Sequence, residues 1–323
     1  MPETNPIAAY LLDGQGSARV LDAEALSKWQ PDDGVLWVHL NYKDAQSCEW
    51  LNQSSGLDSL TVEALLAEET RPRVTPLQGG LLILLRGVNL HPEAEPEDMV
   101  SVRVWINKNQ IFTSQKRELL SVIDINDQLV AGLGPVDAAS FIVDLVDRLI
   151  ARISDIIDEL EDKVDDLEEQ LLSGNSRSLR SDLADLRRQA IAIRRYLAPQ
   201  REALSRLIVE RASWLDDTAT FKLREANDRL IRNIEDIDAL RERASVTQEE
   251  LQNRLSEQLN NRMYVLSVVA AIFLPLGFVT GLLGVNVGGI PGGDNPNAFL
   301  ILVVSLVAVV GLLMVFFRFK KWM

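Results

Sequence analysis

Hydrophobic and polar residues alternate in short runs over the first 135 residues of the chain. Runs that concentrate Val, Ile, Leu and Trp between Gly, Pro and Asn are typical of strands, and the stretches between them have helical periodicity. The pattern therefore predicts an α/β domain over residues 1–135. The predicted strands are 8–12, 35–40, 81–88, 101–106 and 111–114, and the predicted helices are 23–29, 45–53, 60–68 and 116–130.

The next segment has almost uninterrupted helical periodicity and few glycines. LLSGNSRS at 171–178 combines Gly, Asn and Ser, which end helices, so a helical hairpin is predicted to turn there. Pro199 predicts a kink or the start of a helix. LDDTAT at 215–220 supplies Asp and Thr as N-caps for a further helix. The sequence thus predicts hairpin arms over 136–217, followed by a long stalk helix over 218–283.

Small or apolar residues recur every three or four positions along this last helix and continue into its charge-free end. No residue between Thr218 and Leu274 breaks a helix. One chain cannot cover such a stripe, which favours a symmetric bundle of several copies; plain helix packing is the alternative. The stripe consists of Leu223, Ala226, Leu230, Ile234, Ile237, Ala244, Leu251, Leu255, Leu259, Met263, Leu266, Ala270, Leu274, Gly277 and Gly281.

The C-terminal part of the chain is apolar. From Met263 to Phe317 the only charged residue is Asp294, which lies in a Gly- and Pro-rich linker between two stretches of apolar residues. Each stretch has the roughly 20 residues that a membrane-crossing helix needs, and so short a linker makes the two helices antiparallel. The predicted segments are a first transmembrane helix at about 263–283, an outer loop at 284–297 and a second transmembrane helix at 298–317.

Lysine and arginine flank the two spans on one side only, which predicts that both termini face the cytoplasm. The N-terminal MPETNPIAAYLLDG lacks a basic start and a long apolar run, so no secretory signal is expected. We expect a multi-pass protein of the inner (plasma) membrane with a cytosolic α/β domain and a basic cytosolic tail at 318–323. The flanking basic residues are Arg254, Arg262, Arg318, Lys320 and Lys321.

Charge and composition exclude several classes of protein. Acidic residues outnumber basic ones by 47 to 33, giving a net charge of −14, so a nucleic-acid binder that works through a basic face is excluded. With one cysteine and two histidines, the chain has no intramolecular disulfide and no Cys/His cluster for a tight zinc site. It also lacks a phosphate-cradling glycine loop, a nucleophile elbow and a His-Glu-x-x-His pair. We expect neither an enzyme nor a bound cofactor.

Three side chains and one segment carry open alternatives. His39 occupies an alternating strand position, where a packed or hydrogen-bonded histidine is expected. His91 lies in the acidic run HPEAEPED, which is either a solvated loop or a weak metal chelator. Cys48 is expected to be a small buried residue. The acidic stretch 155–169 is either a solvated helix surface or a negative reservoir that concentrates divalent cations.

A family resemblance enters at the end of the first span. Pro275, Gly281 and the triplet Gly284-Val285-Asn286, together with two C-terminal spans and a glycine-rich linker, resemble the CorA superfamily of divalent-cation transporters, which has Gly-Met-Asn at this place. Val285 and the following VGGIPGG look most like its ZntB zinc-transporter branch. TRPRV at 70–74 and LLILLRGVN also look like the cytosolic domain of the family. The resemblance implies a funnel-shaped homopentamer in which five long helices line a pore.

The resemblance also implies roles for residues of the stripe. A ring of five Asn286 carboxamides at the outer mouth would hydrogen-bond the water of a hydrated divalent ion, with Gly284 letting the backbone turn. Leu274, Leu266 and Met263 would be hydrophobic constrictions, and Asn260 a second polar ring. Val285 and Gly277 replace a methionine and a threonine of the family, which leaves ion selectivity open. The implied pore-facing positions are Gly281, Gly277, Leu274, Ala270, Leu266, Met263 and Asn260.

The resemblance implies a zinc transporter that takes other copies of itself, the lipid bilayer and divalent cations as partners. Neither span holds a histidine or a carboxylate. If uptake is coupled to protons, the titrating groups are therefore Asp294, Glu257 or acids of the funnel. Two alternatives stay open: a magnesium, cobalt or nickel channel of the same architecture, and a membrane-anchored coiled-coil scaffold.

Overall fold

The computed structural model describes residues 7–68, 71–77, 79–92, 94–173, 178–210, 212–285 and 295–319. The chain divides into two compact units, residues 1–248 and 249–323, and the boundary falls within one helix. The strands are β1 (Ile7–Leu12), β2 (Ala18–Leu21), β3 (Val35–Asn41), β4 (Arg73–Leu77), β5 (Gly80–Gly87), β6 (Val100–Ile106) and β7 (Gln110–Gln115). The helices are α1 (Ala23–Lys28), the 3₁₀ turn η1 (Pro31–Asp33), α2 (Ala45–Gln53), α3 (Ser59–Leu66), α4 (Leu120–Ala131), α5 (Ala138–Ser173), α6 (Leu179–Glu210), α7 (Asp217–Leu283) and α8 (Ala298–Phe319).

The first unit is built on a seven-stranded mixed sheet with the order β2-β1-β3-β7-β6-β5-β4. β3 and β7 are parallel, and the other described neighbours are antiparallel. All five predicted strands are present. The prediction missed β2 and β4, which form the two edges of the sheet. β4 contains Pro76, which has no N–H to donate and therefore suits an edge strand.

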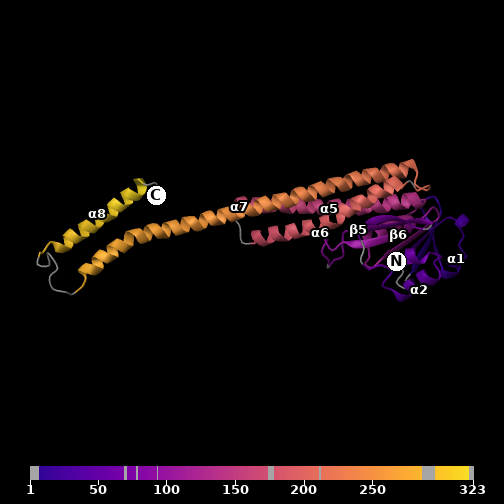
Figure 1. Cartoon of the computed structure of the whole chain (residues 1–323), viewed down its shortest axis with the longest axis horizontal. Coiled ribbons are helices and arrows are strands. Elements are labelled where there is room, and N and C mark those ends of the chain that lie inside the picture. The colour runs from indigo at the N-terminus through magenta and orange to yellow at the C-terminus, as the bar shows by residue number, and fades with distance from the viewer. Residues whose placement is uncertain are drawn as a thin grey trace. The chain divides into compact units, whose positions relative to one another are not determined.

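Helices cover both faces of this sheet (Figure 1). On one face, α2 and α3 bury Leu51 and Leu65 against strand residues such as Val38 and Phe112. On the other face, the long helices α5 and α6 pack against β5. The α/β class predicted from the sequence is confirmed, because alternation along each strand supplies one apolar face to each helical layer.

Aspartates begin several of the helices. The carboxylates of Asp22, Asp44 and Asp58 accept backbone N–H groups at the starts of α1, α2 and α3, as N-caps do. Asp216 accepts the N–H of Ala219 at 2.6 Å at the start of α7, so the predicted cap in LDDTAT is confirmed.

One predicted helix boundary was wrong. The helix expected at 116–130 begins at Leu120, because β7 extends the sheet to Gln115 and the chain needs four further residues to leave it. Of the two alternatives predicted for Pro199, a kink or a helix start, the start is excluded, because α6 runs through this residue. Packing of a long apolar face outweighs the one backbone hydrogen bond that proline removes. The predicted hairpin turn lies between the end of α5 and the start of α6, and its residues 174–177 are outside the described part of the chain.

His39 is a packed histidine, as predicted. Its ring is 5% exposed, and its Nδ1 lies 2.8 Å from the hydroxyl of Thr113 on β7. That hydroxyl also accepts the indole N–H of Trp37 at 2.9 Å. Burial lowers the pKa of His39 to about 4, since the charged imidazolium loses its solvation. The fold therefore holds His39 neutral at physiological pH.

The depressed pKa of His39 predicts acid sensitivity. Neutral His39 contributes stability that is fully present above its unfolded pKa of about 6.5 and is lost as the pH falls toward about 4, up to roughly 3 kcal/mol. Between pH 6.5 and 4.5, wild type should lose more stability than His39→Asn in thermal unfolding of detergent-purified protein. His91→Asn, which changes an exposed histidine, should behave as wild type. Parallel pH profiles for wild type and His39→Asn would contradict the prediction.

Candidate functional site

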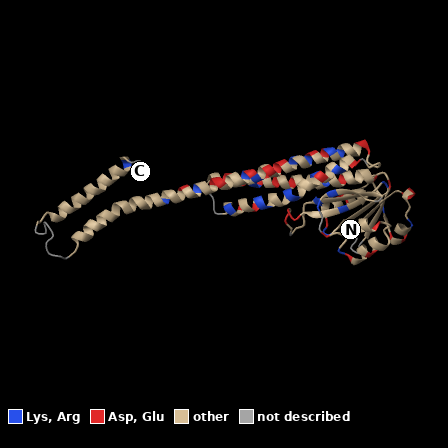
Figure 2. Ribbon diagram, viewed as in Figure 1, with Lys and Arg blue, Asp and Glu red and all other residues tan. Residues whose placement is uncertain are grey.

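Two helices of the second unit have the length and apolar character to cross a membrane. They are the C-terminal part of α7 and the whole of α8, and neither is buried inside the chain. Figure 2 shows basic and acidic residues spread along α5, α6 and the first part of α7, and uncharged ribbon along most of α8. Exposed apolar helix surface of this extent needs lipid or another copy of the chain to cover it.

The serine and threonine hydroxyls within the first span are satisfied by their own helix. Ser267 donates to the carbonyl of Met263 at 2.8 Å, and Thr280 donates to that of Leu276 at 2.9 Å. α7 also continues through Pro275. Bonds of this kind to the preceding turn keep polar groups paired where no water is present. The span is thus suited to a surrounding of hydrocarbon.

The predicted pore-facing positions lie on one side of α7, because the helix is continuous to Leu283 and their spacing is three or four residues. Met263, Leu266 and Leu274 are 61–71% exposed, and Asn260 is also exposed. A Cβ added at Gly277 or at Gly281 would meet nothing within 4 Å. Ala270 is partly exposed. The structure therefore brings these seven residues onto a single stripe that the rest of this chain leaves open.

The segment predicted to form the outer mouth is described as far as Val285, which is 50% exposed. Gly284 donates its N–H to the carbonyl of Thr280 at 2.9 Å, and a Cβ on Gly284 would lie 3.0 Å from that oxygen. Its backbone is outside the left-handed region, so it is the close approach to the last turn that disfavours a larger residue here. Asn286 and Asp294, the other residues predicted at the mouth, lie outside the described residues.

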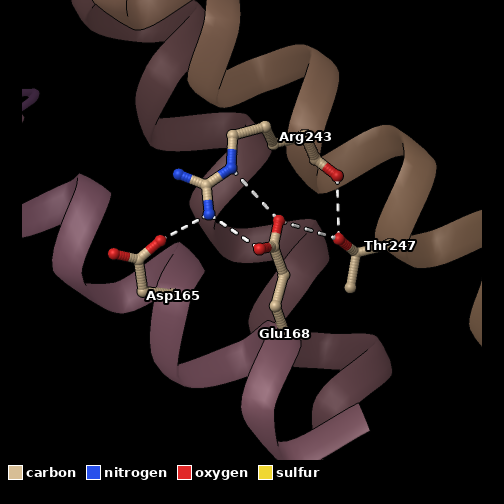
Figure 3. Close-up of polar contacts among 4 residues, drawn as sticks. All are labelled: Asp165, Glu168, Arg243 and Thr247. Atoms are coloured by element: carbon tan, nitrogen blue, oxygen red, sulfur yellow. Dashed lines mark hydrogen bonds and ion pairs between the residues drawn. The ribbon is translucent and has the colours of Figure 1, made fainter. Parts of the chain in front are cut away.

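Ion pairs tie the first part of α7 to the hairpin arms. Figure 3 shows Arg243 of α7 between Asp165 and Glu168 of α5. Its Nε donates to Glu168 Oε1 at 3.1 Å and its Nη2 to Oε2 at 2.7 Å, while Nη2 also pairs with Asp165. These bonds raise the pKa of the Arg243 guanidinium. Thr247 donates to the carbonyl of Arg243 at 2.8 Å and lies 3.5 Å from Glu168 Oε1.

A second bidentate pair joins α6 to α7. Arg194 donates to both carboxylate oxygens of Asp238, at 2.5 and 3.0 Å, which lowers the pKa of that carboxyl. Sequence analysis missed both pairs, because their partners are far apart in the chain and the helix register is not readable from periodicity. At least two acids of the 155–169 stretch, Asp165 and Glu168, hold α7 in place instead of forming a purely solvated face.

Removing Arg243 should loosen α7 from α5 by a modest amount. The pair is partly exposed, so we expect Arg243→Met to cost about 1 kcal/mol at low salt and less in 1 M NaCl, where the Debye length is about 3 Å. Thermal unfolding in detergent at the two salt concentrations measures this. The control is Arg188→Met, because Arg188 is 78% exposed and pairs with Asp185 on its own helix. Equal effects of the two substitutions would contradict a bracing role for Arg243.

Within the described part of the chain, the remaining candidates are not grouped as metal ligands. His91 is exposed, and its backbone N–H donates to the side-chain oxygen of Asn89 at 3.4 Å. Among the described residues, no group of three or more His, Cys, Asp or Glu side chains is placed to hold a metal ion. Cys48 was expected to be buried but is partly exposed; its thiol donates to the carbonyl of Tyr42 at 3.1 Å.

Comparison with known proteins supports the family resemblance. Residues 32–321 match the family model described as CorA-like Mg²⁺ transporter protein. The chain is 39% identical to the divalent cation transporter CmaX of Pseudomonas aeruginosa, covering 92% of this chain and 90% of that one. It is 38% identical to the zinc transport protein ZntB of Cronobacter sakazakii, covering 98% of this chain and 96% of that one.

Solved structures agree over the full length. The full-length CmaX protein superposes with a TM-score of 0.86 at 36% identity, covering 100% of both chains. The CorA magnesium transporter of Methanocaldococcus jannaschii has a TM-score of 0.83 at 18% identity, covering 99% of both chains, which shows a shared fold. The chain therefore belongs to the CorA-like Mg²⁺ transporter family.

Proposed function

We propose that this protein transports zinc, and other divalent cations to a lesser extent, across the inner membrane. The observation that carries the proposal is its 38% identity, over 98% of its length, to a protein described as a zinc transport protein. The two charge-free spans support it, because a membrane transporter needs segments that cross the bilayer. The scaffold alternative has no such support, since the relatives are described as transporters.

The proposed working unit is a homopentamer in which α7 lines a central pore and α8 faces lipid, with both termini in the cytoplasm. The open stripe along α7 supports it, because five copies around an axis would bury what one chain leaves exposed. The orientation rests on Arg254 and Arg262 before the spans and Arg318 after them.

The proposed pore carries no charge along its membrane part. A hydrated divalent ion would meet carboxamide oxygens of Asn286 at the outer mouth, then small and apolar positions from Gly281 to Met263, then the amides of Asn260. Uncharged dipoles hold the water of the ion without stripping it or binding it tightly. The leucine and methionine rings would gate conduction by dewetting. Met263 would also offer a soft sulfur at the inner end of the span.

A magnesium, cobalt or nickel channel is the second candidate, favoured by the family description and by the match to a divalent cation transporter. Zinc flux into proteoliposomes, measured with and without equimolar magnesium, separates the two. We expect zinc flux to persist in magnesium. A full block by equimolar magnesium would favour the second candidate. Reversing an imposed pH gradient tests proton coupling, and unaltered flux would exclude it.

Asn286→Ala tests the outer ring. Loss of the amide oxygens should abolish or deregulate zinc uptake, because the proposed ring would lose its hydrogen bonds to the water of hydrated ions. Uptake is measured in the same vesicles at matched protein content. Asn297→Ala, the same change beside the start of α8, serves as the control and should leave uptake unchanged. Normal uptake by Asn286→Ala would argue against the amide ring and in favour of a pore selected elsewhere.

A further inference from the structure

A cavity of about 260 Å³ opens at one edge of the sheet, where the parallel strands β3 and β7 both end. Tyr42 directly follows β3, and Lys116 and Arg117 directly follow β7. In open α/β sheets, ligands collect outside the carboxyl ends of parallel strands, because the chain leaves the sheet there and its side chains and loops enclose a crevice. The cavity is lined by Tyr42, Glu68, Arg86, Glu97, Asp98, Met99, Val100, Ser101, Lys116, Arg117 and Tyr196.

A buried cation lies beneath this cavity. Arg103 of β6 is 0% exposed, and its guanidinium carbon is 4.2 Å from the centre of the Tyr42 ring. Its Nη2 donates to the hydroxyl of Tyr42 at 3.2 Å, to the carbonyl of Glu68 at 3.3 Å and to that of Ala67. Among the described residues, its Nε and Nη1 have no hydrogen-bond partner. In the part of the chain that the structure describes, only neutral groups accept hydrogen bonds from this guanidinium, which favours an electropositive floor of the cavity.

The hydrogen bond from Arg103 also determines the hydrogen-bonding role of the Tyr42 hydroxyl. Tyr42 is buried, and its hydroxyl oxygen accepts the hydrogen bond from Arg103. The hydroxyl hydrogen of Tyr42 is therefore directed away from the guanidinium, and Tyr42 lines the cavity. A phenol whose oxygen is bonded to a cation is a stronger donor than an isolated one, since charge-assisted and linked hydrogen bonds strengthen one another. Tyr42 is thus a polarised O–H donor among the residues that line the cavity.

The wall of the cavity adds a second guanidinium. Arg86 lies near the end of β5, beyond the last residue that β4 pairs, and its backbone N–H donates to Gln200 of α6 at 2.7 Å. Its guanidinium donates to the carbonyl of Met99 at 2.8 Å and stacks over the Tyr196 ring at 4.8 Å. A half-buried arginine placed by three elements is rigid, which suits recognition of an oxyanion.

The acidic lining residues lie toward solvent. Glu68 and Asp98 are exposed, as Lys116 and Arg117 are, and Glu97 is half-buried, whereas Tyr42 and Arg103 are buried. Water screens the outer carboxylates more than it screens the inner donors. The inner end therefore favours an anion, while the acids at the mouth and the net charge of −14 select against large polyanions such as nucleic acid.

We propose that this cavity is a cytosolic binding site for the phosphate group of a small soluble metabolite, held by Tyr42, Arg86, Lys116 and Arg117. Donors from three separate chain segments suit a tetrahedral oxyanion, whose oxygens point in several directions, better than a planar carboxylate. The volume is near the lower end for ligand sites, which fits a phosphate with few further atoms. The occupant would bridge the sheet and α6.

Isothermal titration of the full-length protein in detergent with inorganic phosphate, in metal-free buffer at constant ionic strength, tests this site. Wild type should bind saturably. Tyr42→Phe removes the floor donor without changing the ring and should weaken binding about tenfold, and Lys116→Gln should weaken it about threefold. Lys108→Gln makes the same charge change at the opposite end of the sheet, in the β6–β7 turn, and should bind as wild type does.

Several results would overturn the proposal. They are no saturable binding by wild type, equal affinity in wild type, Tyr42→Phe and Lys116→Gln, or an equal loss in Lys108→Gln and Lys116→Gln, which would indicate a general charge effect. Lys116 is exposed, so its substitution leaves packing intact and keeps the test valid if Tyr42→Phe disturbs Arg103. Zinc flux is not part of the readout, so the site and the transport function are tested separately.

Discussion

Replacing Gly277 with leucine is expected to stop metal transport while leaving the fold of each chain unchanged. A side chain at this position meets nothing within 4 Å in one chain, and leucine favours a helix more than glycine does by roughly 1 kcal/mol. In a pentamer, however, five leucines at this level of the stripe would narrow the lumen and exclude water. Zinc flux into proteoliposomes should fall by more than about tenfold, because dewetting of a hydrophobic ring stops conduction.

Val279→Leu is the matched control for Gly277→Leu. Val279 follows Gly277 closely on α7 and is 38% exposed. At about 100° per residue, its side chain points away from the stripe, about 200° around the helix from position 277. This variant should transport zinc as wild type does. Both variants should keep the oligomer size of wild type in size-exclusion chromatography with light scattering. If Gly277→Leu conducts normally, the stripe on α7 does not line the pore.

Most of the architecture could be predicted from the patterns of apolar and polar residues along the chain. Runs such as 35–40 and 101–106 could be assigned to strands because they concentrate β-branched and aromatic residues, and the structure buries nearly all of them between two helical layers. The continuous stripe of α7 and the charge-free spans were equally readable, since a stop signal within them would require glycine, proline or charge at particular positions. Pro275 stands in the span and still does not end the helix, as neighbouring turns carry the helix through.

The missed features are those that depend on register between distant segments. β2 is only four residues long, and Val20 in it is 68% exposed, so it has no apolar face to reveal it. Arg103 reads as a polar position in a strand, and nothing in its neighbours predicts that it is fully buried beneath Tyr42, 61 residues earlier in the chain. Arg243 and Glu168 likewise meet only because α5 and α7 pack at one particular register.

For the predicted pore residues, too, one property could be predicted from the sequence and another could not. Their helical spacing could be read from the sequence, and the structure places the predicted pore residues between Met263 and Gly281 on one side of α7. Whether that side faces a lumen depends on contacts between copies, which are set by surfaces and not by the periodicity of one chain. For this reason the Gly277 and Val279 pair of variants is informative: both place a leucine on α7, and the two leucines lie on different sides of the helix.

Trp37→Ala should be the most destabilising single substitution in the sheet layer. Trp37 is 0% exposed, stacks on Tyr10 with ring centres 4.9 Å apart and lies 5.0 Å from the ring of Phe141 on α5. Its indole N–H donates to Thr113 at 2.9 Å. Removing it leaves a large cavity between β3 and α5 and an acceptor without its donor, at a cost of about 3–5 kcal/mol. That is a large share of the roughly 5–15 kcal/mol by which domains are stable.

Two further variants help to interpret the loss of stability in Trp37→Ala. Trp37→Phe keeps most of the ring but loses the N–H, and should cost about 1–2 kcal/mol. Trp29→Ala removes a partly exposed tryptophan whose N–H donates to the Gly34 carbonyl at 3.3 Å, and should cost less than Trp37→Ala. Thermal unfolding in detergent, followed by circular dichroism, ranks the three. If Trp29→Ala lowers the melting temperature as much as Trp37→Ala does, then the contact between β3 and α5 is not what holds the arm to the sheet.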